Sequence, residues 1–289
     1  MTLVSIFRHL IAIYFVAVHA IPSSACATFY AKLPNVSHAL CDQARLAPSG
    51  ARSVRGRPVL VRDVAPATPR RRVLVVGAMH GDEFSAASLA LYWIKQAVEF
   101  PDKTHWRFIP VLNPDGLLNR PPQRMNAHGV DLNRNFPTPN WQREAPLYWE
   151  KRTRKDPRRW PGRAPLSEPE ARYLFDVMNQ FKPHVIVSIH APYGVLDFDG
   201  PVLPPTRLGR LYLDQVGVFP GSLGNYSGVH RGIPVVTVEL PSALRTPLDA
   251  EMRQMWNDLN VWMDKTLTSK DPAQGTMHPP KTSTLMVGH

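Results

Sequence analysis

Three short runs of this chain are apolar at nearly every position and end at a histidine or a carboxylate. VLVVGAMHGDE, which starts at Val73, carries His80 and Glu83; PHVIVSIHAP carries His190; IPVVTVELPSA carries Glu239. Strands without polar alternation are typical of a sheet that is buried on both faces, as in α/β proteins. Ligands of such sheets bind beyond the carboxyl ends of the strands. We therefore expect these polar tips to converge on one site.

Helical patterns alternate with these strands. Apolar residues recur at three- and four-residue steps over residues 84–98, which predicts a helix packed on the sheet. Ser167 and Glu170 predict a capping box that opens a helix running to about Phe181, and a last helix is expected over residues 247–265. Two further strands are expected in SVRGRPVLVRDV and HWRFIPVLNPDG, the second ending in an Asn-Pro-Asp-Gly turn. The alternation predicts an α/β fold, a three-layer αβα sandwich with a mixed, mostly parallel central sheet.

The N-terminal residues have the pattern of a secretory signal peptide. A start with one arginine leads into LIAIYFVAVHA, an apolar run too short to span a bilayer. Residues 1–20 are therefore interpreted as a signal peptide, with cleavage after Ala20 or as late as Ala27. We expect the mature protein to be exported, periplasmic or secreted, and to have no integral membrane segment. Residues 28–268 are expected to form one domain, and the tail, residues 269–289, lacks a core pattern and is predicted to be disordered.

The chain has two cysteines, and whether they pair depends on the cleavage site. Cleavage after Ala20 leaves Cys26 and Cys41, which in an oxidising compartment would close a short loop, whereas cleavage after Ala27 leaves Cys41 alone. A lipid anchor on Cys26 is disfavoured because Ser23, three residues earlier, is not aliphatic. Two cysteines near an exported N-terminus are more often structural than catalytic or metal-binding.

The chain is basic, with 34 lysines and arginines against 23 acidic residues and a net charge of +11. Part of the excess lies in KRTRKDPRRWPGR, residues 151–163, which holds seven basic residues and one acid without helical or strand periodicity. A solvated surface loop is one interpretation of this segment, and attraction to an anionic polymer such as the cell wall is another. Nucleic acid is not expected as a partner, because the predicted export argues against it.

His80, Glu83 and His190 together form a donor set suited to zinc. Catalytic zinc commonly has three protein ligands and one open position for water, and two histidines with one glutamate are a known combination. A single histidine at a strand end is more often only a polar residue at the rim of a sheet. The set gains weight from the segment RMNAHGVDLNRNFP, residues 124–137, which occurs in the same chain.

With that segment the chain resembles the M14 family of zinc carboxypeptidases. The motifs HGDE, GVDLNRNFP, SIHAP and TVELP occur here in the family's order, and the resemblance spans roughly residues 52–265. It implies that residues 28–268 form a zinc carboxypeptidase catalytic domain. It also implies one Zn²⁺ per chain, held by His80, Glu83 and His190.

The resemblance implies roles for five more residues. Glu239 would be the general base and proton shuttle, beside the metal but not bound to it. Arg134 with Asn133 would bind the terminal carboxylate of the substrate, which a guanidinium fork matches. Arg124 would stabilise the oxyanion of the tetrahedral intermediate, and Tyr226, in the segment PGSLGNYSG, would cap the substrate.

Within the family, the segments RSVRGRP, NPDG, SIHAP and GSLGNYSGVHRGIPVVTVELP are most similar to enzymes that release meso-diaminopimelate from γ-D-glutamyl peptides of the cell wall. This likeness implies a murein peptide as substrate and hydrolysis of its γ-D-Glu-meso-diaminopimelate bond. Asp197 and Asp199 would then receive the ammonium group of the diaminopimelate side chain. A simple loop with acidic turn residues is an equal interpretation of this pair.

Three alternatives remain open. An N-acyl amino acid deacylase of the aspartoacylase or succinylglutamate desuccinylase type shares the zinc core but tends to be cytoplasmic. A broad-specificity exported carboxypeptidase differs only in its pocket. A metal-free wall-binding module is disfavoured because all three ligands, Glu239 and both arginines are retained.

Overall fold

The computed structural model describes residues 25–267. The predicted signal peptide and the predicted disordered tail lie outside these residues, and both stay predictions. Within the described part of the chain, no helix combines the length and the apolar character needed to cross a membrane.

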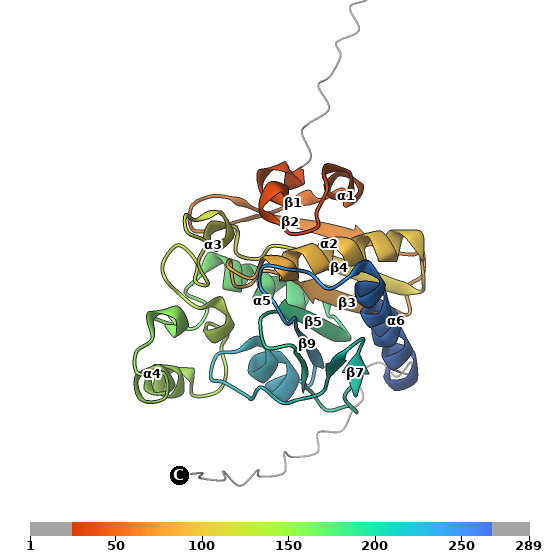
Figure 1. The fold of residues 1–289 in the computed structure, drawn as a ribbon. Coiled ribbons are helices and arrows are strands. Elements are labelled where there is room, and N and C mark those ends of the chain that lie inside the picture. The colour runs from red at the N-terminus through yellow and green to blue at the C-terminus, as the bar shows by residue number, and fades with distance from the viewer. Residues whose placement is uncertain (1–24, 268–289) are drawn as a thin grey trace, which may run out of the picture.

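The centre of the protein is a mixed sheet of seven strands in the order β1-β2-β4-β3-β5-β9-β6 (Figure 1). The four central strands β4, β3, β5 and β9 run parallel, whereas β1, β2 and β6 join at the two edges in antiparallel pairs. A separate two-stranded ribbon consists of β7 and β8. The strands are β1 (Ala47–Arg52), β2 (Pro58–Val64), β3 (Arg71–Val76), β4 (Thr104–Ile109), β5 (Val185–His190), β6 (Val195–Asp199), β7 (Arg207–Leu208), β8 (Leu211–Tyr212) and β9 (Val235–Glu239).

Helices cover both faces of the sheet. The α-helices are α1 (His38–Gln43), α2 (Phe84–Glu99), α3 (Pro114–Leu118), α4 (Trp141–Lys151), α5 (Pro169–Phe181) and α6 (Asp249–Thr266). Short 3₁₀ segments are η1 (Ala25–Thr28), η2 (Tyr30–Lys32), η3 (Leu132–Arg134) and η4 (Pro157–Arg159), and η5 (Gly224–His230) is a π-helix.

The alternation of side chains along each strand divides the core into two clusters. Val73 and Val75 of β3 point to the cluster that contains α2 and α6, which lie together on one side of the sheet (Figure 1). Leu74 and Val76 point to the other cluster, which contains the apolar face of α5. Burial on both faces explains why these strands lack polar alternation. The predicted three-layer α/β fold with a mixed sheet is confirmed, with parallel pairing confined to the central strands.

Helix α5 ends at Phe181 as predicted, but the predicted capping box does not form. The helix begins with Pro169 at its first position and has no side-chain cap. Ser167 Oγ donates to Glu168 Oε1 at 2.7 Å, and Glu170 accepts hydrogen bonds from the backbone N of Val54 and from Asn126. Glu170 is fully buried, so its carboxylate fastens the helix to its neighbours and is not free to cap. The expected Asn-Pro-Asp-Gly turn is instead the start of α3.

A disulfide joins Cys26 to Cys41. It ties η1 to α1, and both cysteines are fully buried. This pairing is the one expected if the signal peptide is cleaved before Cys26. With the disulfide formed, the sulfur of Cys26 is not available for a lipid anchor. The cleavage site itself stays a prediction, and the candidate site after Ala20 lies outside the described residues.

The parallel strands bring the polar tips to one edge of the sheet. His190 and Glu239 are paired residues at the ends of β5 and β9. The chain after β3 turns away from the sheet and presents His80 and Glu83 before α2 begins. This turn packs against α3 so closely that a Cβ on Gly81 would lie 2.2 Å from the carbonyl carbon of Gly116. Glycine is required at this position because no side chain fits between the two segments.

Candidate active site

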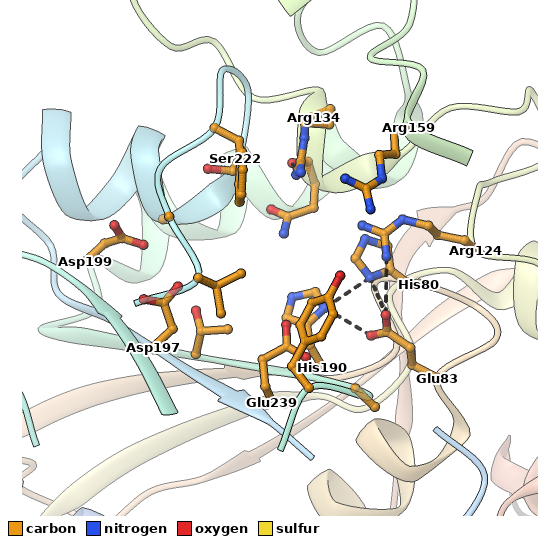
Figure 2. Close-up of a pocket in the computed structure, with 18 residues that line it drawn as sticks. His80, Glu83, Arg124, Arg134, Arg159, His190, Asp197, Asp199, Ser222 and Glu239 are labelled. Carbon is orange, nitrogen blue, oxygen red and sulfur yellow. Dashed lines mark hydrogen bonds and ion pairs between the residues drawn. The ribbon is translucent and has the colours of Figure 1, made fainter. Parts of the chain in front are cut away.

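The three predicted metal ligands meet in one buried cluster. The donor atoms of His80, Glu83 and His190 all lie within 4.8 Å of one another, and each residue is at most 4% exposed. Nδ1 of His80 lies 2.8 Å from Oε1 of Glu83, and Nδ1 of His190 lies 3.1 Å from Oε2 of the same carboxylate. The two Nδ1 atoms are 3.1 Å apart. Figure 2 shows the three side chains pointing toward one another.

The other nitrogen of each histidine has its own partner. Nε2 of His80 lies 3.1 Å from Oδ1 of Asp131, and Nε2 of His190 lies 2.9 Å from Oγ of Ser188. Asp131 is fully buried and Ser188 nearly so. Such partners fix the orientation and tautomer of a metal-binding imidazole. Both Nδ1 atoms are therefore directed at the centre of the cluster.

The electrostatics of the cluster favour a cation. Burial and Arg124 lower the pKa of His80, but the carboxylates of Glu83 and Asp131 outweigh them and the pKa is raised. Burial raises the pKa of Glu83, but His80 and His190 hold it well below its usual value. Negative charge that draws a proton to these lone pairs will also draw a metal ion to them.

Glu239 lies beside the cluster, and one oxygen of its carboxylate is unpaired. It is 7% exposed, and its Oε2 is buried without a hydrogen-bond partner. Burial raises the pKa of its carboxyl, while His190 lowers it and Glu83 raises it. A buried carboxylate with a raised pKa and an unpaired oxygen is suited to accept a proton from a group that enters the pocket.

Arg124 lies at the same edge of the pocket, oriented by buried carboxylates. Its Nε and Nη2 donate to Oδ2 of Asp131 at 3.1 and 3.0 Å, and its Nη1 lies 3.5 Å from Oε1 of Glu83. Asp131 therefore positions both a predicted metal ligand, His80, and this guanidinium. Burial lowers the pKa of Arg124, but Asp131 and Glu83 raise it above its usual value, so the group is a permanent cation.

Asn133 and Arg134 line the pocket from the short segment η3. Arg134 is 6% exposed, its Nη1 donates to the carbonyl of Asn133 at 2.7 Å, and its Nε is buried without a partner. Its guanidinium lies 4.5 Å from the centre of the Phe219 ring. Asn133 uses its Oδ1 to accept from the backbone N of Leu223 at 2.8 Å, which leaves its NH₂ group for a ligand. The pair offers unsatisfied donors to a carboxylate.

The opposite end of the pocket is acidic. Asp197 and Asp199 line it from β6 and are drawn on the far side of the pocket from Arg124 (Figure 2). Within residues 25–267 neither carboxylate forms an ion pair with a lysine or arginine. Burial, together with the charge of Asp197, raises the pKa of Asp199 to about 7. Asp199 lies against Gly224 of η5, where a Cβ would approach its Oδ2 to 1.9 Å.

Tyr226 is not brought into this pocket. Its ring is 8% exposed and stacks on Phe136 at 6.0 Å, and its hydroxyl accepts a hydrogen bond from Arg231 at 3.1 Å. The side chain belongs to the core cluster around α5. The tyrosine that lines the pocket is Tyr193, three residues after His190 and 60% exposed.

Three functional candidates were not identified from the sequence. Asp131 stands in the motif GVDLNRNFP, and Ser188 precedes His190 by two residues on the same face of β5, so both had a signal in spacing. Arg159 lines the pocket from the basic segment 151–163, and no pattern in the sequence indicates this position.

Comparison with known proteins agrees with the geometry. The sequence profile of the zinc carboxypeptidases, peptidase family M14, matches residues 35–196. Murein peptide amidase A of Vibrio campbellii (strain ATCC BAA-1116) is 31% identical over 208 residues, which cover 70% of this chain and 79% of that protein. Murein peptide amidase A of Escherichia coli (strain K12) is 33% identical over 148 residues, 50% of this chain and 59% of that protein, so the match spans less than two thirds of the latter.

Solved structures give the same result. The murein-tripeptide amidase of Escherichia coli O157 superposes with a TM-score of 0.53 at 26% identity, covering 75% of this chain and 96% of that chain. Carboxypeptidase A of Helicoverpa armigera has a TM-score of 0.59 at 18% identity, covering 78% and 70%, and shows the shared fold. The family profile spans the segments that carry the ligand cluster and the arginines, over more than half of the sequence. The chain belongs to the M14 family of zinc carboxypeptidases.

Proposed function

We propose that this protein is an exported zinc carboxypeptidase that hydrolyses the bond between γ-D-glutamate and meso-diaminopimelate in murein peptides. The proposal is supported by the family, by the names of the relatives in Vibrio and Escherichia, and by the charges of the pocket. Export rests on the predicted signal peptide alone. The basic charge of the chain suits an anionic cell wall.

The residues of the cluster fit a zinc ion. Two imidazole nitrogens and one carboxylate converge, and the outer nitrogens of the imidazoles are fixed by Asp131 and Ser188. This is the donor set of catalytic zinc, with room left for a water or a carbonyl oxygen. When bound, zinc would polarise the scissile carbonyl and make a water acidic enough to attack near neutral pH.

The side chains of this chain divide the remaining work. Glu239 takes the proton of the attacking water on its free Oε2 and delivers it to the leaving amine, which departs as a neutral group. Arg124 holds its guanidinium at the rim of the cluster, where it stabilises negative charge that develops on the carbonyl oxygen. Arg134 and Asn133 bind the α-carboxylate of the terminal residue and so place the scissile bond.

One observation favours a terminal residue with a cationic side chain. Asp197 and Asp199 line the same pocket as Arg134, and neither carboxylate is paired with a lysine or arginine of the described chain. Asp197 is buried and Asp199 is partly buried, and carboxylates removed from water without a cationic partner are costly unless a ligand supplies the charge. Diaminopimelate carries an ammonium group at the far end of its side chain. A terminal lysine also carries one, so a carboxypeptidase for basic residues is the second candidate that the same acids favour.

Comparative hydrolysis separates the candidates. The mature protein is incubated with L-Ala-γ-D-Glu-meso-diaminopimelate, with its L-lysine counterpart and with an α-linked dipeptide that ends in lysine, and free amino acids are followed by mass spectrometry. The proposal predicts release of diaminopimelate at the highest rate, because diaminopimelate carries a carboxylate beside its distal ammonium group and a site built for both groups rejects an analogue that lacks one of them. Release from the α-linked peptide alone would establish the basic carboxypeptidase. Hydrolysis of an acylated amino acid, offered as a fourth substrate, without action on any of the three peptides would establish the deacylase.

A further inference from the structure

The basic segment 151–163 is fastened to the rim of the active site. Nη2 of Arg158 lies 2.7 Å from Oδ2 of Asp82, the residue that precedes the metal ligand Glu83. The backbone N of Asp131 donates to the carbonyl of Trp160 at 2.9 Å. Asp82 is the neighbour of the ligand Glu83 in the sequence, and Asp131 contacts the ligand His80. The segment is therefore a wall of the site, in addition to being a charged surface.

These anchors place Arg159 in the pocket. Arg159 lines the same cavity as the metal ligands, and Figure 2 draws its guanidinium beside the pocket, above Arg124. Burial lowers the pKa of Arg134, and the charges of Arg124 and Arg159 lower it further, whereas Asp131 opposes them. The ion pair of Arg159 within the described residues joins it to Asp156 at 3.5 Å, and its side chain is 42% exposed. Its donors are largely free for a ligand.

Arg159 lies where the part of the substrate that precedes the scissile bond is expected to bind. The terminal residue lies between Arg134 and the acids Asp197 and Asp199, as argued under the proposed function. In Figure 2 these acids are to the left of the metal cluster, whereas Arg159 is drawn above the cluster and Arg124 at its upper right. The acyl portion of the substrate extends from the scissile carbonyl in the direction away from the terminal side chain. It therefore extends toward Arg159.

We propose that Arg159 binds the free α-carboxylate of a γ-linked glutamyl residue on the acyl side of the scissile bond. In a γ-linked donor this carboxylate is only a few bonds from the carbonyl under attack, whereas an α-linked peptide has a neutral amide in the main chain. A guanidinium with free donors matches a carboxylate in shape and charge. Arg159 thus selects γ-linked over α-linked substrates, and Arg158, through Asp82, is a positioning residue. This inference rests on the proposed function.

Two substrates that differ in one group test the inference. One is L-Ala-γ-D-Glu-meso-diaminopimelate, and the other has the α-carboxylate of its glutamate replaced by a carboxamide. Kinetics are measured for the zinc-loaded wild type, Arg159→Gln, Arg159→Lys and Arg163→Gln. Arg163 is the matched control, because it lies in the same segment, is exposed, does not line the pocket and loses the same charge.

The wild type and Arg163→Gln are expected to prefer the carboxylate substrate by roughly 10-fold to 100-fold in kcat/KM, the range of a charged hydrogen bond. Arg159→Gln should lose this preference by slowing on the carboxylate substrate alone, and Arg159→Lys should retain part of it. Equal losses on both substrates, or no loss on the carboxylate substrate, would overturn the inference while leaving the proposed function in place. Failure of the wild type to cut either γ-linked substrate would overturn both.

Discussion

Replacing Asp131 by asparagine tests how the proposed metal ligands are oriented. The carboxylate of Asp131 is fully buried and contacts Nε2 of His80, Nε and Nη2 of Arg124 and the backbone N of Asn133. Asparagine has the same shape and keeps one oxygen for these donors, but it removes the negative charge. The change therefore acts on His80 and Arg124 without opening a cavity.

The size of the expected loss in zinc affinity follows from the number of contacts that Asp131 makes with the proposed ligands. A single contact of Asp131 reaches a proposed ligand, so zinc affinity should fall by the 10-fold to 100-fold that is usual for such a partner, about 1.4 to 2.7 kcal/mol. Turnover at saturating zinc should fall as well, because Arg124 loses the charge that holds it in place. Ser188→Ala is the matched control: it removes one neutral partner of His190 and should weaken zinc by about 0.5 to 1.5 kcal/mol.

The assay is a competition titration of zinc against a chromophoric chelator, performed on wild type, Asp131→Asn and Ser188→Ala, with circular dichroism to show that each variant is folded. The expected order of affinity is wild type, then Ser188→Ala, then Asp131→Asn. If folded Asp131→Asn binds zinc as tightly as the wild type, the argument that this carboxylate orients His80 is wrong.

Four further predictions concern the other groups of the pocket. Glu239→Gln should retain zinc and lose turnover by about 10² to 10⁴, the usual contribution of a general acid or base, and normal turnover would remove Glu239 from the mechanism. Asp199 has a pKa raised from 3.8 to about 7, so the cost of its ionisation to folding is absent below about pH 4, increases between the two pKa values and is complete above about pH 7. Asp199→Asn should therefore raise the Tm more at pH 8 than at pH 5, and an equal or opposite shift would contradict the assignment. The same variant should lose the preference for a terminal residue with an ammonium group, which for the wild type should increase as pH rises through about 7. Gly224→Ala should displace the Asp199 carboxylate, with an overpacking cost of about 1 to 3 kcal/mol and the same loss of preference, measured by thermal unfolding and by kcat/KM on the diaminopimelate and leucine peptides.

The sequence was sufficient to predict the parts of the site that lie on buried strands or in the turns beside them. His190 and Glu239 end strands whose apolar runs are unmistakable, and because parallel strands end at one edge, their convergence follows from the fold class. The predicted ligands of the cluster and the α/β architecture belong to this predictable part. Their roles in catalysis stay predictions.

Features that depend on contacts between distant segments were missed or wrong. Helix α4 has Pro146 in its interior and a polar sequence, so no apolar stripe marks it. The capping box failed because burial of Glu170 against Val54 competes with a local cap. Arg159 lies in a segment held at the pocket by contacts with distant residues, among them the pairing of Arg158 with Asp82, 76 residues away, which no local pattern reveals.

The pocket acids illustrate the same limit. Asp197 and Asp199 were equally consistent with a simple turn, since short acidic stretches are common in loops. Their place in the pocket depends on β6 pairing with β9 and on the approach of η5, where Gly224 leaves room for the carboxylate of Asp199. Tyr226 stands two residues later in the same segment, but the π-helix directs its ring into the core.

The central claim is that the cluster of His80, Glu83 and His190 is the metal centre of a murein peptide hydrolase. Its most direct test is the release of free diaminopimelate from L-Ala-γ-D-Glu-meso-diaminopimelate, measured by mass spectrometry before chelation, after chelation and after zinc is added back, with His190→Ala as a folded comparison. The account predicts release that disappears with the metal, returns with zinc and is absent in His190→Ala. Release that persists in the metal-free protein or in His190→Ala would contradict it.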